Sequence, residues 1–169
     1  PPRMYLSRLR RSDHQLGLSV FSTASGTFCI TGGLGGLGLC AAELLTSGDV
    51  PAQRVVLSSR TGQVSGSSAA RWKSLMADTP SRQLQWVQAD VGDGQDAKSL
   101  IYGALSKLQG VLHAAGCLYD TMLRSVVAVQ LELIASPKSY GASLVHHGCL
   151  RTPLSARISF SSDAAAFAN

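Results

Sequence analysis

The chain has 169 residues, enough for one domain with a buried core, and 45% of them are hydrophobic against 15% charged. Its net charge of +5 does not form a basic stripe, because four arginines less one aspartate place +3 of it near the N-terminus (Arg3, Arg8, Arg10, Arg11, Asp13). Nucleic acid is therefore not an expected partner. The absence of a long apolar run argues against a signal peptide or a membrane span, and four scattered cysteines without a C-x-x-C pair favour no metal site and a cytoplasmic protein.

The first predicted elements are an apolar strand at 27–30 and a helix, joined by a glycine turn that begins at Thr31. This order places the unpaired N–H groups of a helix N-terminus where a pyrophosphate can bind, and glycines let the backbone approach it. The glycines are too many to give G-x-G-x-x-G a single register, and T-G-x-x-x-G-x-G also fits, on Thr31, Gly32, Gly36 and Gly38. A flexible linker is disfavoured by the framing strand and helix. Apolar spacing predicts that Leu37, Ala41, Leu44 and Leu45 share the buried helix face. The predicted phosphate-binding residues are Thr31, Gly32, Gly33, Leu34, Gly35, Gly36, Leu37 and Gly38.

Strands and helices alternate along the rest of the chain. Further strands are predicted at 54–58, 84–89, 110–114 and 157–161, and helices at 69–77, 95–107, 122–134 and 139–147, with a break at Ser136-Pro137. Such alternation predicts an α/β fold, a Rossmann-like doubly wound parallel sheet. Ligands of these sheets bind beyond the carboxyl ends of the strands, so the residues that follow each strand carry the chemistry.

The second and third predicted strands end in residues suited to a phosphorylated adenosine. Ser59 and Arg60 stand where a cofactor without the 2′-phosphate usually meets an Asp or Glu, so NADPH is favoured over NADH, although a solvated surface arginine is the alternative. After the third strand, Asp90 can accept the adenine amino group while Val91 packs on the ring. Asp90 could equally cap the following helix, and the residues alone leave both readings open.

The fourth predicted strand ends in small residues. Ala114, Ala115 and Gly116 let the backbone pass close to a cofactor. His113, which precedes them, is expected to be a hydrogen-bonded core histidine and is assigned no chemistry.

Six motifs now stand in a fixed order, and together they resemble the ketoreductase (KR) domain of modular polyketide synthases, a branch of the short-chain dehydrogenase/reductase superfamily. The ketoreductase of animal-type fatty acid synthase is the near relative. The resemblance covers 27–169, and residues 1–26 would be a linker or the tail of a preceding structural subdomain. The motifs are Thr31–Gly38, Ser59-Arg60, Asp90-Val91, His113–Gly116, Pro137-Lys138 and Phe160-Ser161-Ser162.

The resemblance implies that NADPH reduces the β-keto group of an acyl thioester held on an acyl carrier protein, beside neighbouring synthase domains. Ser162 would bond the carbonyl oxygen, and Lys138 would hold the nicotinamide ribose and lower the pKa of a catalytic tyrosine. In the family that tyrosine follows the serine shortly, and this sequence ends before it. We therefore expect a domain that is incomplete at its C-terminus and inactive alone.

Two other functions remain as alternatives. One is a non-catalytic structural Rossmann module of a synthase, and the other is a free-standing NADP-binding protein. Selective affinity for NADPH over NADH would favour the ketoreductase, whereas a folded chain that binds neither would favour the structural module.

Overall fold

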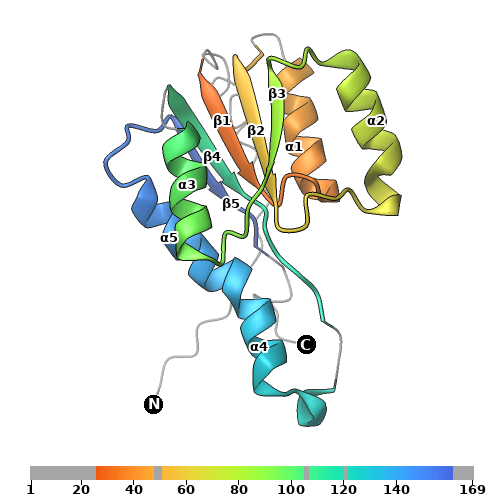
Figure 1. The fold of residues 1–169 in the computed structure, drawn as a ribbon, viewed down its shortest axis with the longest axis vertical. Helices are drawn as coiled ribbons and strands as arrows, with labels where there is room; N and C mark the ends of the chain where they lie inside the picture. The colour runs from red at the N-terminus through yellow and green to blue at the C-terminus, as the bar shows by residue number, and fades with distance from the viewer. Residues whose placement is uncertain (1–25, 48–50, 105–106, 120–121, 162–169) are drawn as a thin grey trace, which may run out of the picture.

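Five parallel strands form one sheet at the centre of the computed structural model, which describes residues 26–47, 51–104, 107–119 and 122–161. The order across the sheet is β3-β2-β1-β4-β5 (Figure 1). The chain therefore winds outward in both directions from β1, which confirms the predicted doubly wound α/β fold. The strands are β1 (Thr27–Thr31), β2 (Arg54–Ser59), β3 (Leu84–Gln88), β4 (Leu108–His113) and β5 (Ala156–Ser159).

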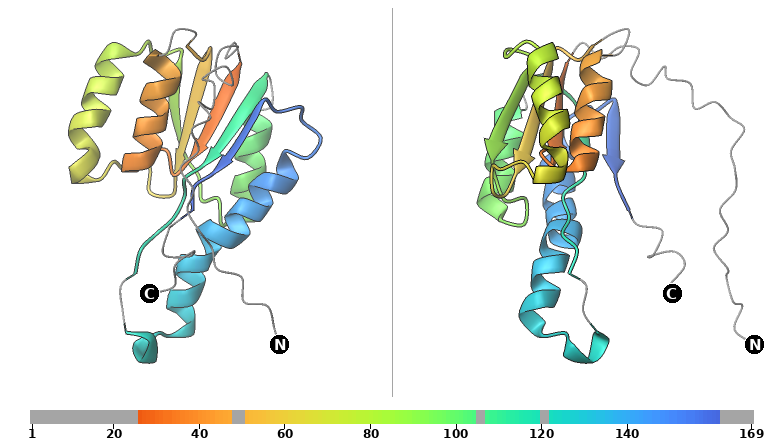
Figure 2. Two further views of the ribbon diagram at one scale, coloured as in Figure 1. Left: turned by 180° about the vertical axis from the view of Figure 1, so that it is seen from behind. Right: turned by 90° about the vertical axis from the view of Figure 1, so that its right-hand side faces the viewer.

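Helices cover both faces of the sheet (Figure 2). On one face, α1 (Gly36–Ser47) and α2 (Ala69–Asp78), which follows the 3-10 turn η2 (Gly66–Ser68), pack on Phe28, Ile30 and Leu57. On the other, α3 (Gly94–Ala104) and α5 (Gly141–Gly148) pack on Cys29, Val56 and Val111. Burial on both faces explains why β1 and β2 read as continuous apolar runs rather than alternating ones. In the described part of the chain, no helix has the length and apolar character needed to cross a membrane.

The buried face of α1 differs from the prediction. Leu37 and Leu44 are 50% and 76% exposed, whereas Leu39, Ala42 and Leu45 are buried against the sheet. Small residues dominate the contact face, because α1 begins directly after the glycine turn and lies close to the strands. The 37, 41, 44, 45 pattern was therefore wrong in placing Leu37 and Leu44 inside.

The predicted break at Ser136-Pro137 is also wrong. A 3-10 turn, η3 (Leu123–Ser125), precedes α4 (Ala128–Ala135), and α4 continues through a π-helical turn, η4 (Ser136–Tyr140), into α5. Pro137 has no N–H to bond the Leu133 carbonyl four residues earlier, and the Cys117 thiol donates to that carbonyl instead, at 3.0 Å. A partner from a distant segment thus allows the helix to continue through a proline.

Candidate functional site

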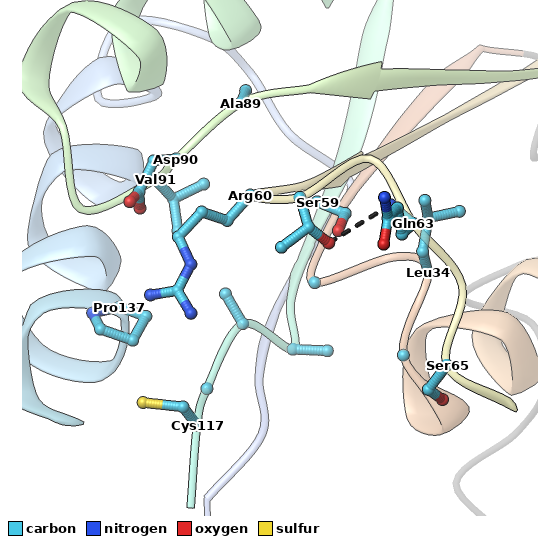
Figure 3. Close-up of a pocket in the computed structure, with 16 residues that line it drawn as sticks. Leu34, Ser59, Arg60, Gln63, Ser65, Ala89, Asp90, Val91, Cys117 and Pro137 are labelled. Carbon is cyan, nitrogen blue, oxygen red and sulfur yellow. Dashed lines mark hydrogen bonds between the residues drawn. The ribbon is translucent and has the colours of Figure 1, made fainter. Parts of the chain in front are cut away.

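A cavity of about 260 Å³ lies at the carboxyl ends of β1, β2, β3 and β4 (Figure 3). This is the edge at which the fold class places its ligands. Ten of the predicted site residues line the cavity: Gly32, Leu34, Gly35, Ser59, Arg60, Asp90, Val91, Ala114, Ala115 and Gly116.

The glycines of the turn after β1 have different structural roles. Gly32 has φ +65°, and a Cβ there would lie 2.6 Å from the Ala114 carbonyl oxygen. At Gly38 a Cβ would lie 2.5 Å from the Gly32 carbonyl oxygen. Gly36, the first residue of α1, differs, because the nearest atom to its Cβ would be Ser68 Oγ at 3.7 Å. Protein packing thus requires glycine at 32 and 38, as in the T-G-x-x-x-G-x-G register, and leaves space open at Gly36.

The other motif residues in this turn support the cavity from outside it. Thr31 is fully buried, and Gly33 packs against β2, where a Cβ would lie 2.7 Å from Leu57 Cβ. Leu37 is half exposed and is not among the residues that line the cavity.

The end of β2 brings a cation to the cavity. Ser59 and Arg60 both line it, and Figure 3 shows the Arg60 side chain extending between Val91 and Pro137. The Arg60 carbonyl accepts a hydrogen bond of 3.2 Å from Gln88 Nε2 of β3, which ties the two strand ends together. Three polar residues of the loop that follows the same strand end also line the cavity and were not predicted, although their position after β2 was the available signal: Thr61, Gln63 and Ser65.

The structure excludes the helix-cap reading of Asp90. The N-terminus of α3 is capped by Asp93, whose Oδ1 accepts from the backbone N–H groups of Gln95 (2.8 Å) and Asp96 (2.9 Å). Asp90 instead accepts from the Gly92 N–H at 2.9 Å and lines the cavity. Asp90 is therefore not the helix cap, and its position suits contact with a ligand.

Beyond β4 the chain passes under a lysine. A Cβ on Gly116 would lie 3.2 Å from Lys138 Cε, so the Lys138 side chain crosses directly over this glycine. Lys138 is exposed and lies in the π-helical turn η4. Ala89, Cys117 and Pro137 also line the cavity and were not predicted to do so. Ala89 and Cys117 adjoin predicted site residues and Pro137 belongs to the Pro137-Lys138 motif, which was the available signal.

His113, the last residue of β4, is buried and has partners on both ring nitrogens. Thr31 Oγ1 lies 2.8 Å from Nδ1, and the Pro137 carbonyl lies 2.9 Å from Nε2. Burial lowers the pKa of His113 below its ordinary value of 6.5. The residue is thus a satisfied core histidine, as expected from the sequence.

Comparison with known proteins places this geometry in a family. The model of the KR domain matches residues 26–169. This chain belongs to the KR-domain family. The KR domain is 35% identical over 144 residues to a mycocerosic acid synthase-like polyketide synthase of Mycobacterium tuberculosis, covering 84% of this chain and 7% of that protein. It is 32% identical over 168 residues to a phenolphthiocerol/phthiocerol polyketide synthase from the same species, covering 96% and 9%.

Solved ketoreductases share the fold of this KR domain. An N-terminal ketoreductase from the macrolactin assembly line superposes with a TM-score of 0.71 at 27% identity, over 87% of this chain and 30% of that one. A-type ketoreductases from a modular polyketide synthase give 0.72 at 26% identity, over 86% and 30%. The KR domain therefore corresponds to roughly a third of each solved chain.

The predicted catalytic residues of the KR domain are only partly described. Lys138 is not among the lining residues but contacts Gly116, which lines the cavity, whereas Ser162 falls outside the described residues. Among the residues that the structure describes, no group of three or more His, Cys, Asp or Glu side chains could hold a metal ion.

Proposed function

We propose that this KR domain binds NADPH in the cavity and serves the reduction of a β-keto acyl thioester, carried on an acyl carrier protein, to the β-hydroxy compound. The observation that carries the cofactor assignment is Arg60 at the end of β2, where its side chain reaches the cavity. Dinucleotide sites for NADH hold the ribose with an acidic residue near this strand end, and a guanidinium suits a 2′-phosphate instead.

Residues that line the cavity, together with the adjoining N-terminus of α1, fit the parts of NADPH in order. The open backbone at Gly36, at the N-terminus of α1, would take the pyrophosphate. Asp90 would accept from the adenine amino group and Val91 would pack on its ring, while Ser59 and Arg60 would hold the 2′-phosphate. Once bound, NADPH supplies a hydride.

Two further residues would act at the reacting end. Lys138 would bind the nicotinamide ribose, and Ser162 would donate a hydrogen bond to the substrate carbonyl oxygen, which stabilises the negative charge that develops there. Residues 27–169 would form the cofactor-binding part of this KR domain, and residues 1–26 would be a linker.

The test compares NADPH with NADH binding by the wild-type chain, Arg60→Ala and Arg54→Ala. Arg54 is the matched control, because it begins the same strand at the end away from the cavity and donates a hydrogen bond to the Gln85 side chain. A charge-assisted hydrogen bond contributes about 1.5–3 kcal/mol, so Arg60→Ala should weaken NADPH binding about 10- to 100-fold and leave NADH binding nearly unchanged.

Two results would contradict the proposal. Equal wild-type affinity for the two cofactors would remove the NADPH assignment. Binding of neither cofactor by the folded chain would favour the structural module.

A further inference from the structure

The π-helical turn changes which backbone groups bond around Pro137. In an α-helix the Gly141 N–H would donate to the Pro137 carbonyl, four residues earlier. Here it donates to the Ser136 carbonyl, five residues earlier. The Pro137 carbonyl instead meets the His113 ring, with 2.9 Å between its oxygen and Nε2. The end of β4 thus contacts the helix at the residue immediately before Lys138.

The partners of His113 fix its tautomer. A carbonyl oxygen can only accept, so the ring proton lies on Nε2 and is donated to Pro137. The neutral ring then accepts at Nδ1 from the Thr31 hydroxyl, 2.8 Å away. Thr31 is the first residue of the glycine motif, so this chain of hydrogen bonds connects the phosphate turn, the end of β4 and the turn that carries Lys138.

The π-helical turn is also held from its other side. The Ser136 side chain occupies the space that a Cβ on Gly92 would need, and Gly141 lies close to Val91, where a Cβ would be 3.0 Å from the Val91 carbonyl oxygen. The turn is therefore packed against the loop that follows β3, while His113 is its polar contact from β4. With both sides held, the backbone at Lys138 has little freedom to rotate.

We infer that His113 is a positioning residue for Lys138: its hydrogen bond to the Pro137 carbonyl fixes the π-helical turn so that the lysine side chain crosses over Gly116 into contact with a bound nicotinamide ribose. The inference rests on the proposed function, which supplies the ligand. His113 itself cannot reach that ligand as an acid or base, because it is buried and both ring nitrogens are already bonded.

The test separates the two halves of the cofactor. NADPH contains the nicotinamide ribose, whereas 2′,5′-ADP contains only adenosine with its 2′- and 5′-phosphates, which would bind at the other end of the cavity. In His113→Leu the donor to Pro137 is lost, and NADPH affinity should fall about 3- to 10-fold, as expected for one hydrogen-bonded contact. Affinity for 2′,5′-ADP should stay within about twofold of wild type. His113→Gln carries an amide N–H near the position of Nε2 and should restore NADPH binding.

A second set of variants tests whether His113 acts through Lys138. Lys138→Met should weaken NADPH binding, and adding His113→Leu to it should cause no further loss, because the two changes remove the same interaction. If His113→Leu does not fold, His113→Asn replaces it, since its short amide can meet Thr31 but not Pro137.

The outcomes distinguish this inference from the proposed function. Equal loss of NADPH and 2′,5′-ADP in the His113 variants, or additive losses with Lys138→Met, would overturn the positioning role while wild-type NADPH selectivity stood. His113→Asn with wild-type NADPH affinity would do the same. A wild-type chain that does not bind NADPH would remove the proposed function and this inference with it.

Discussion

A single methyl group at Gly36 should separate cofactor binding from folding. Gly36 is the first residue of α1, and a Cβ there would meet nothing nearer than Ser68 Oγ at 3.7 Å. Among the described glycines, positive φ occurs at Gly32 and Gly62 and not at Gly36. Gly36→Ala is therefore compatible with the fold. The added methyl group would nevertheless lie at the helix N-terminus, where the proposed pyrophosphate site needs bare backbone.

The expected changes in fold stability and in NADPH affinity have opposite signs. Replacing a helical glycine by alanine stabilises a protein by at most about 1 kcal/mol, so the melting temperature should hold or rise slightly. Losing one charge-assisted hydrogen bond to a phosphate costs about 1.5–3 kcal/mol, which lowers NADPH affinity about 10- to 100-fold.

Gly94→Ala is the matched control. Gly94 is the first residue of α3, and a Cβ there would meet nothing within 4 Å. Both variants are measured by thermal denaturation and by titration of NADPH fluorescence. If folded Gly36→Ala binds NADPH as tightly as Gly94→Ala does, the pyrophosphate does not lie at this helix N-terminus and the reasoning fails.

Two other predictions concern thiols and pH. Burial raises the pKa of Cys29 to about 12 and also raises that of Cys149, so a thiol reagent should modify the half-buried Cys40 and Cys117 first. NADPH should slow the modification of Cys117, which lines the cavity. Equal modification rates at all four thiols would contradict the predicted order. Burial lowers the pKa of His113, so the folded state binds fewer protons at this residue than the unfolded state does. The free energy of unfolding should therefore be highest above about pH 6.5 and should fall as the pH drops below that value. Urea denaturation between pH 5 and pH 8 should show a smaller loss for His113→Gln, and an equal loss would refute the assignment to this residue.

The strands were predictable because their signal is local. A buried parallel strand needs a short apolar run. Both ends of each of the five predicted runs lie within two residues of the ends of an observed strand. The strand ends then follow from topology, which is why Arg60 and Asp90 could be placed at one edge of the sheet from the sequence alone.

The errors arise where a distant group changes a local rule. A proline such as Pro137 ordinarily ends a helix, because it leaves a carbonyl of the preceding turn without a donor. Here the Cys117 thiol donates to that carbonyl, and no residue near Pro137 in the sequence predicts this contact. The exposure of Leu37 and Leu44 has a similar origin, since the approach of α1 to the sheet is decided by the glycines before it rather than by its largest apolar residues.

The π-helical turn also has a consequence for how sequences of this kind are compared. Such a turn holds one residue more than the α-helical turn it replaces, and both complete one revolution of the chain. Deleting one residue between Ser136 and Tyr140 would thus restore regular winding without breaking the helix and without changing which faces α4 and α5 present to each other. An alignment that forbids gaps inside helices would shift Lys138 by one position in a relative without the extra residue, and would report as lost a lysine that had only changed its place in the numbering.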